Sequence, residues 1–223
     1  MATDAHKAGR TRKPLVHHGV ELRCTARYEA EARAAGHVRI AGVDEVGRGA
    51  LCGPVVAGAV ILGDDFDTTG LDDSKRLTRR QRERLAERIR GHALAWATGA
   101  AEPLEIDRVN ILQATHIAMQ RALAGLRMAP DFLLLDALRL PGVDVPQLGI
   151  VKGDALSVSI AAASIIAKVA RDAAMRACES LYPGYGLGHN MGYASEDHRD
   201  ALRRLGPSLI HRRSFQGTQP WLF

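Results

Sequence analysis

The chain has 223 residues, 46% of them hydrophobic and 25% charged, which suits one globular domain around one core. No apolar run approaches the roughly 20 residues of a membrane-spanning helix. The first residues are polar, so we expect a cytoplasmic protein with no membrane partner. The net charge of +5 favours a polyanionic partner, whereas an aromatic content of 4% argues against broad base-stacking platforms. Cys24, Cys52 and Cys178 are widely spaced and include no C-x-x-C pair, which indicates reduced thiols and neither a disulfide framework nor a zinc motif.

The N-terminal part is predicted to be peripheral. Residues 1–18 are basic and are expected to form a disordered tail, and one domain is expected over residues 19–223. A short polar helix over residues 21–35 would lead into the first strand.

Two adjacent carboxylates end the first predicted strand. Residues 38–43 are rich in branched side chains, and Asp44 and Glu45 follow them directly. Like charges side by side repel each other unless a cation, a proton or a ligand compensates them. Because carboxylate oxygens are the ligands that Mg²⁺ and Mn²⁺ prefer, the pair indicates a divalent metal site. An acidic turn capped by glycines is the alternative.

The loop that follows holds an arginine between two glycines. Gly47, Arg48 and Gly49 match neither the dinucleotide-binding fingerprint nor the P-loop. Glycine lets a ligand approach the backbone closely, and the guanidinium is a donor for phosphate. The loop therefore suits a phosphate or a sugar hydroxyl.

An antiparallel meander is predicted next. A strand over residues 55–62 is followed by a basic helix that Thr78 caps and that runs to Arg90, and then by a strand over residues 93–100. Short links favour antiparallel pairing of the three strands. The helix and the residues before it carry a one-sided excess of arginine, which indicates either phosphate contacts or a solvated face. A second basic cluster lies near the C-terminus and comprises Arg203, Arg204, His211, Arg212 and Arg213.

The second half predicts parallel strands. An amphipathic helix over residues 110–126 precedes a strand over residues 131–136 that ends on Asp136. A brief strand over residues 147–151 is followed by Asp154, which opens a long alanine-rich helix over residues 155–178. Its small residues would allow close packing on the sheet. This order of elements favours parallel pairing.

The acids are expected to converge. Ligands gather at the C-terminal ends of strands in α/β sheets, so Asp44, Glu45, Asp136 and Asp154 are predicted to form one divalent metal site. Asp154 as an N-cap and Asp136 as a loop-initiating residue are the alternatives. Asp172 lies four residues after Lys168 and is predicted to form an ion pair with it on the helix surface, outside the metal set.

Several motifs, in order from about residue 38 to 215, resemble bacterial ribonuclease HII, the type 2 ribonuclease H. These are Val43-Asp44-Glu45-Val46-Gly47-Arg48-Gly49, Asp73-Ser74-Lys75-Arg76-Leu77, Asn110-Ile111-Leu112-Gln113-Ala114, Leu135-Asp136-Ala137, Lys152-Gly153-Asp154, Ala161 to Val169 and Tyr182-Pro183-Gly184-Tyr185-Gly186. The resemblance implies an α/β fold of ribonuclease H type: a mixed sheet, with an antiparallel meander and parallel strands, flanked by helices. A small helical part is expected over about 180–215.

The resemblance also implies an activity. It is that of a metal-dependent endonuclease cutting 5′ to ribonucleotides embedded in duplex DNA and in the RNA strand of RNA–DNA hybrids, leaving a 5′-phosphate and a 3′-hydroxyl. Such an enzyme serves in ribonucleotide removal from DNA and in RNA primer removal. Asp44, Glu45, Asp136 and Asp154 take the family's catalytic positions and would hold two divalent ions, Mn²⁺ or Mg²⁺, with Asp44 as the shared ligand.

The resemblance further implies a set of substrate-binding residues. Gly47, Arg48 and Gly49 would sense the 2′-hydroxyl, Ser74 and Lys75 would contact the substrate, and Tyr193 would lie at the RNA–DNA junction. On sequence alone, Tyr193 also fits a packed loop aromatic.

The sequence departs from the family's pattern at two positions, and two other functional interpretations stay open. Where the family commonly has histidine and lysine before the Gly-Tyr pair, this chain has Asn190 and Met191. A non-catalytic nucleic-acid-binding module and a nuclease that requires a run of ribonucleotides are the rival interpretations. The enzyme is expected to be a monomer. The end of the chain, with Gln216, Gln219, Trp221, Leu222 and Phe223, has the polar-then-aromatic character of a tail that docks weakly on a sliding clamp, and a frayed terminus is the alternative.

Overall fold

A five-stranded mixed sheet forms the centre of the computed structural model, which describes residues 16–17, 20–21 and 23–218. The strand order is β5-β4-β3-β6-β7. The strands are β3 (Ile40–Val46), β4 (Val55–Ile61), β5 (Ala95–Ala101), β6 (Phe132–Asp136) and β7 (Gln147–Ile150). β3, β4 and β5 pair antiparallel, and β6 pairs parallel with both β3 and β7. The predicted meander and the predicted parallel strands are both confirmed.

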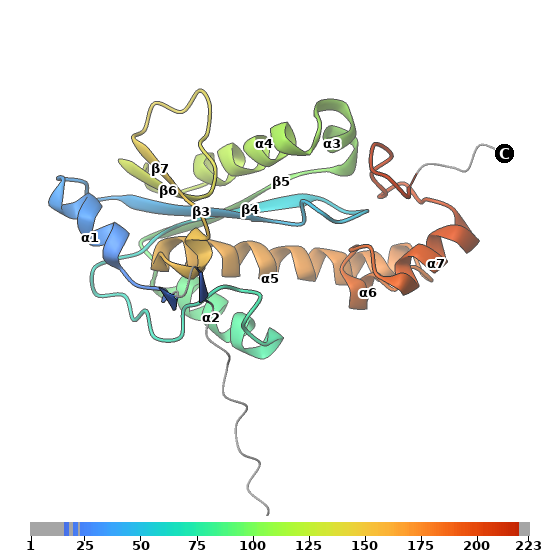
Figure 1. Ribbon diagram of the computed structural model, residues 1–223, viewed down its shortest axis with the longest axis horizontal. Coiled ribbons are helices and arrows are strands. Elements are labelled where there is room, and N and C mark those ends of the chain that lie inside the picture. The colour runs from blue at the N-terminus through green and yellow to red at the C-terminus, as the bar shows by residue number, and fades with distance from the viewer. Residues whose placement is uncertain (1–15, 18–19, 22, 219–223) are drawn as a thin grey trace, which may run out of the picture.

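Helices cover both faces of this sheet (Figure 1). α4 (Ile111–Ala124) packs on β4 and β5, and α3 (Pro103–Val109) precedes it on the same side. α5 (Val158–Leu181) packs on the other face against β3 and β4, with α2 (Arg79–His92) outside it. Thr78 caps α2 as predicted, in a capping box with Gln81. α3 was not predicted.

Close packing of α5 requires glycine in the strands beneath it. A Cβ on Gly42 would lie 2.0 Å from the carbonyl carbon of Ser159, and one on Gly58 would lie 2.3 Å from the carbonyl oxygen of Ala163. Neither strand could carry a side chain at that position without moving the helix. The predicted role of the small residues in α5 is confirmed, and the sheet supplies matching gaps.

Two element boundaries differ from the predictions. β3 continues through Asp44 and Glu45, because β4 goes on pairing with them opposite Gly58 and Ala57. α5 begins only at Val158, and its N-cap is Ser157, whose hydroxyl accepts the N–H of Ile160 at 3.3 Å. Asp154 lies earlier, in the 3₁₀ turn η1 (Gly153–Ala155), so the N-cap alternative for Asp154 is wrong.

The N-terminal part also differs. Residues 1–15 and 18 of the predicted tail lie outside the described residues. Val16–His17 (β1) pairs antiparallel with Val20–Glu21 (β2). The helix expected from residue 21 begins at residue 27, as α1 (Arg27–Ala34).

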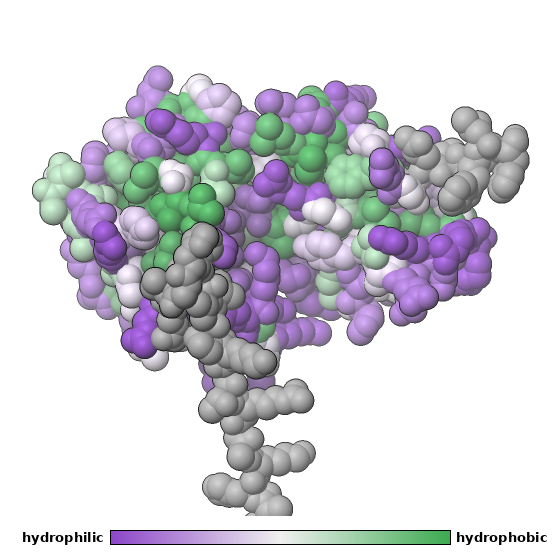
Figure 2. Space-filling view, viewed as in Figure 1, coloured by the Kyte–Doolittle hydropathy of each residue, from purple (hydrophilic) through white to green (hydrophobic). Residues whose placement is uncertain are grey.

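The predicted C-terminal helical part contains α6 (Leu187–Asn190), which packs against α5, and α7 (Glu196–Leu205), which lies beyond the end of α5 (Figure 1). Hydrophilic residues cover α7 at the lower right of Figure 2, and its exposed positions include Arg203 and Arg204. Among the described residues, no helix has both the length and the apolar character needed to cross a membrane.

Candidate active site

The register of two parallel strands brings the predicted acids together. Val43 of β3 lies opposite Leu135 of β6, so Asp44 and Asp136 follow at neighbouring positions. Asp136 is the last residue of β6, and its Oδ1 accepts the N–H of Gly153 at 2.7 Å. This hydrogen bond places the turn that carries Asp154 beside the end of the sheet.

Asp44 and Glu45 approach this place from opposite faces of β3. Side chains alternate along a strand, so Asp44 shares the face of Gly42, which α5 covers, and Glu45 starts from the other face. Asp44 is buried, and its Oδ1 accepts the N–H of Glu45 at 2.8 Å. We call Asp44, Glu45, Asp136 and Asp154 the carboxylate cluster.

Burial and mutual repulsion raise the pKa values of the carboxylate cluster. Burial raises the pKa of Asp44 well above its ordinary value, and the charges of Glu45 and Asp136 raise it further, against a hydrogen bond from Ser164. Burial, and then the charge of Asp154, raise the pKa of Asp136. Asp154 has a raised pKa through burial and the nearby Asp73.

One carboxylate oxygen of Glu45 has no hydrogen-bond partner among the described residues. Burial raises the pKa of Glu45 even though Nη1 of Arg48 lies 3.3 Å from Oε1. Its other oxygen, Oε2, is buried without a hydrogen-bond partner among the described residues. A buried, unpartnered carboxylate oxygen within a group of acids is a donor set that fits a hard divalent cation.

Lys75 and Ser74 lie next to the cluster in different ways. Nζ of Lys75 is 3.3 Å from Oδ2 of Asp154, and 79% of the lysine side chain is exposed, so the ammonium can also meet a ligand from solvent. Burial lowers the pKa of Lys75, but the carboxylates of Asp154, Asp73 and Asp44 together raise it above its ordinary value. Ser74 is buried, and its hydroxyl lies 2.9 Å from that of Ser164 on α5.

The glycines of the Gly47 to Gly49 loop have different roles. Gly47 has φ +92°, and a Cβ there would lie 2.1 Å from Nε of Arg171, so this position requires glycine. A Cβ on Gly49 would meet nothing within 4 Å, and its φ lies outside the left-handed region. Gly49 therefore leaves open space beside Arg48, whose side chain is 43% exposed.

Tyr193 lies between cations. Tyr193 is 36% exposed, and the centre of its ring lies 5.3 Å from the guanidinium carbon of Arg171 and 5.7 Å from Nζ of Lys168. Asn190 and Met191 shape the preceding turn. Asn190 Oδ1 accepts the N–H of Gly192 at 2.8 Å, and Met191 has φ +52° and accepts a hydrogen bond from Arg171 through its carbonyl.

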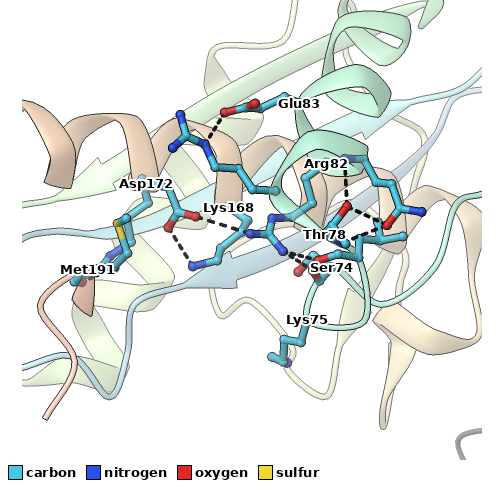
Figure 3. A network of polar contacts seen from close by, with 12 residues as sticks. Ser74, Lys75, Thr78, Arg82, Glu83, Lys168, Asp172 and Met191 are labelled. Atoms are coloured by element: carbon cyan, nitrogen blue, oxygen red, sulfur yellow. Dashed lines mark hydrogen bonds and ion pairs between the residues drawn. The ribbon is translucent and has the colours of Figure 1, made fainter. Parts of the chain in front are cut away.

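A partly buried ionic network joins α5 to α2 and to the loop of Ser74. Lys168 contacts Asp172 at 2.7 Å as predicted, but Asp172 is buried, so its predicted place on the helix surface is wrong. Figure 3 shows the guanidinium of Arg82 between Asp172 and Ser74. It lies 3.8 Å from Oδ2 of Asp172 and donates to the Ser74 carbonyl at 2.9 Å. We call Lys168, Asp172 and Arg82 the α5 network.

Several basic residues that the sequence favours as surface charge or phosphate contacts are buried or partly buried structural cations. Arg82 and Arg88 are partly buried, and Arg88 contacts Asp67 at 2.7 Å. Arg212 is fully buried and donates from Nε to the Gly53 carbonyl at 3.0 Å, and His211 beside it is also buried. Arg171 is buried in α5 and donates from Nε to the Pro54 carbonyl at 2.9 Å. Its position in an alanine-rich helix is the sequence feature that could have indicated its burial.

Comparison with known proteins identifies the family. The sequence profile described as Ribonuclease HII matches residues 41–218. Ribonuclease HII of Desulfitobacterium hafniense (strain Y51) is 56% identical over 187 residues, which cover 84% of this chain and 72% of that protein. This chain belongs to the ribonuclease HII family. The family's activity makes it a ribonuclease H, an endonuclease that acts on RNA–DNA hybrids.

Solved structures of the ribonuclease HII family have the same fold. The ribonuclease H2 of Pyrococcus horikoshii OT3 superposes with a TM-score of 0.68 at 27% identity, over 81% of this chain and 95% of that one. The ribonuclease HII of Archaeoglobus fulgidus, solved in a complex with PCNA, gives a TM-score of 0.65 at 26% identity, over 82% of this chain and 98% of that one. The predicted ribonuclease H-like fold is confirmed.

Proposed function

We propose that this ribonuclease HII is a metal-dependent endonuclease acting on ribonucleotides within duplex DNA and on the RNA strand of RNA–DNA hybrids. It cuts the phosphodiester on the 5′ side of the ribonucleotide and leaves a 5′-phosphate and a 3′-hydroxyl. It acts as a cytoplasmic monomer in ribonucleotide removal and primer removal. The observation that carries the proposal is the carboxylate cluster, with its unpartnered Glu45 oxygen, beside the exposed cations of Lys75 and Arg48.

The four carboxylates are the proposed metal ligands and catalytic residues. Asp44, Glu45, Asp136 and Asp154 would hold two Mg²⁺ or Mn²⁺ ions, with Asp44 as the shared ligand. When bound, such ions supply an activated water and stabilise charge on the leaving oxygen. The Gly153 N–H holds Asp136, and Ser164 and the Glu45 N–H hold Asp44, so the protein fixes the ligands before substrate arrives.

Phosphate contacts position the duplex without reading its sequence. Lys75, beside Asp154, and Arg48, beside Glu45, supply exposed positive charge next to the carboxylate cluster. Asp154 and Glu45 orient these two side chains toward the place where a scissile phosphate would bind. Ser74 contributes to substrate binding by fixing the backbone before Lys75, since its hydroxyl contacts Ser164.

Recognition of the ribonucleotide needs a contact with its 2′-hydroxyl, the only group that distinguishes it from a deoxyribonucleotide of the same base. The exposed backbone of Arg48 and Gly49 would let polar main-chain groups approach that hydroxyl, and Gly47, buried against Arg171, would fix the turn before them. Tyr193, held by Arg171 and Lys168, presents a ring to the sugar next to it. A close contact between this ring and the sugar would distinguish an RNA–DNA junction from other positions in the duplex.

A sliding clamp is a proposed further partner. Phe215 is anchored, since its N–H donates to the Arg212 carbonyl at 3.0 Å and its ring lies 5.0 Å from the Arg212 guanidinium carbon. The rest of the predicted docking tail, residues 219–223, lies outside the described residues. Deletion of residues 219–223 should abolish weak binding to a clamp and leave cleavage unchanged. Retention of clamp binding by the deleted protein would disprove this role.

The test of the main proposal is cleavage of an end-labelled DNA duplex carrying one ribonucleotide, with Mg²⁺, Mn²⁺ or chelator. We expect one cut 5′ to the ribonucleotide, absent with chelator and at least ~10³-fold slower in Asp136→Asn, a loss of about 4 kcal/mol of transition-state stabilisation. Cutting only of long hybrids would favour the nuclease that needs a run of ribonucleotides. No cut of either substrate, with duplex binding that survives Asp136→Asn, would favour the binding module.

A further inference from the structure

A chain of hydrogen bonds links the turn of Tyr193 to the C-terminal segment through two buried histidines. His198 of α7 and His211 are buried, and their Nε2 atoms lie 3.1 Å apart. Nδ1 of His198 lies 3.0 Å from the Tyr193 carbonyl oxygen. Nδ1 of His211 lies 3.0 Å from the Ser208 backbone nitrogen and 2.8 Å from its hydroxyl.

The partners determine where each proton lies. The Tyr193 carbonyl only accepts, so His198 carries its proton on Nδ1 and leaves Nε2 as an acceptor. The Ser208 backbone N–H only donates, so His211 accepts at Nδ1 and donates from Nε2 to His198. Both rings are neutral in this arrangement. Burial lowers the pKa of both rings, with that of His211 at about 4, which agrees.

The same geometry argues against a metal at this place. The Cys52 sulfur and one nitrogen of each histidine lie within 4.8 Å of one another. A metal on His211 Nε2 would move its proton to Nδ1, against the Ser208 N–H that Nδ1 now accepts. Burial also raises the pKa of the Cys52 thiol to about 12, so the thiolate ligand is disfavoured. Cys52 is a neighbour of the histidine chain and has no role in it.

The segments linked by His198 and His211 are also hydrogen-bonded to the loop of Arg48. Leu51 donates its N–H to the Gly192 carbonyl at 2.8 Å, and Arg212 donates its N–H to the Leu51 carbonyl at 2.9 Å. Nη1 of Arg212 donates to the Arg48 carbonyl at 2.9 Å. The turn before Tyr193, the Arg48 loop and the segment that carries His211 are therefore one hydrogen-bonded unit.

We propose that His198 and His211 are positioning residues for Tyr193, which they hold at a fixed place relative to the Arg48 loop and so make the enzyme selective for the ribonucleotide junction. The inference rests on the function proposed above for Tyr193 and the loop. A misplacement of about 1 Å at a reacting substrate can cost ~10²-fold in rate. The Tyr193 carbonyl accepts two hydrogen bonds, one from Nδ1 of His198 and one from the Ser195 N–H at 2.8 Å, so loss of the ring donor removes one of the two.

The test is a double-mutant cycle in the full-length protein on the single-ribonucleotide duplex. His198→Phe keeps a ring and removes the donor, and it should lower kcat/KM roughly 10- to 100-fold. Added to Tyr193→Ala, it should cause no further loss, because it acts through the residue already removed. Most positions of a long RNA–DNA hybrid are not RNA–DNA junctions, so its cleavage by His198→Phe should fall less than cleavage of the single-ribonucleotide duplex. Cys52→Ala, the matched control, should cut at the wild-type rate.

A second pair of variants, at His211, separates loss of the hydrogen bond from a folding defect. His211→Gln keeps a neutral donor toward His198 and should cut nearly as fast as wild type, whereas His211→Leu should resemble His198→Phe. If wild type fails to cut the duplex, the proposed function fails. If wild type cuts but His198→Phe cuts as fast, if its loss multiplies with that of Tyr193→Ala, or if His211→Gln is no better than His211→Leu, the histidine inference alone is overturned.

Discussion

The carboxylate cluster and the α5 network are both partly buried and charged, but their charges are arranged in opposite ways. Asp172 faces Lys168 at 2.7 Å and Arg82 at 3.8 Å. Asp44 faces Glu45 and Asp136, and within the part of the chain that the structure describes no Lys, Arg or His forms an ion pair with it. Paired buried charges hold elements together once formed. The four acids of the carboxylate cluster have two exposed cations, Arg48 and Lys75, beside them and still repel each other, so the cluster costs stability that a ligand or protons recover.

The α5 network should be the more damaging of the two to break. Asp172→Asn leaves the partly buried ammonium of Lys168 without its counter-charge and should destabilise the fold by about 3 kcal/mol. Urea unfolding in chelator measures this. A change below about 1 kcal/mol would mean that the network lies at the surface in solution.

The loop between the two regions should tolerate a side chain at one glycine only. Gly47→Ala places a Cβ against Arg171 in a left-handed conformation and should cost roughly 3 kcal/mol. Gly49→Ala is the matched control, and its stability should be unchanged or up to about 1 kcal/mol higher. Equal unfolding midpoints for the two variants would contradict the packing of Gly47 on Arg171.

Metal should stabilise the carboxylate cluster and leave the α5 network unaffected. At 100 times its Kd, Mn²⁺ should raise the unfolding free energy of wild type by about 2.7 kcal/mol. Asp136→Asn should lose most of this gain, measured as the shift in Tm on adding metal. The shift in Asp172→Asn should equal that of wild type, and an equal shift in Asp136→Asn would place the metal elsewhere.

Removing one charge from the carboxylate cluster should stabilise the metal-free protein. Asp44→Asn should gain about 1–2 kcal/mol at pH 7 in chelator, because it relieves repulsion from Glu45 and Asp136. The pKa of Asp44 is raised in the folded state, so above about pH 4 the native state binds more protons than the unfolded chain. Wild-type stability should therefore fall relative to Asp44→Asn as the pH rises from about 4. If the unfolding free energies of the two proteins change with pH in parallel, the proposed repulsion of Asp44 by Glu45 and Asp136 is wrong.

Local pattern was sufficient for the carboxylate cluster. Asp44 and Asp136 each come at the end of a short apolar strand, and parallel pairing of those strands follows from the order of elements. The close packing of α5 followed from its small residues. Boundaries were less accurate, since pairing with β4 extends β3 through Glu45 and the chain needs an extra turn before Ser157 caps α5.

Burial of the basic residues did not follow from local pattern. Arg212 donates to a carbonyl 159 positions away, and Arg171 to one 117 positions away. In sequence these side chains have the appearance of ordinary surface charge, because the carbonyls they satisfy belong to a distant loop. The same holds for the contact of Arg82 with Asp172, although the pair of Asp172 with Lys168 followed from their spacing.

The sequence by itself determined that acids would meet at the strand ends, because strand period, strand order and short links bring those residues together whatever the loops do. Only the tertiary structure decided which charges are paired. His198 meets His211, and Arg82 meets Asp172, where α7, the C-terminal segment and α2 pack against α5 and the Arg48 loop. Such contacts depend on the path of the whole chain, and no periodicity records them.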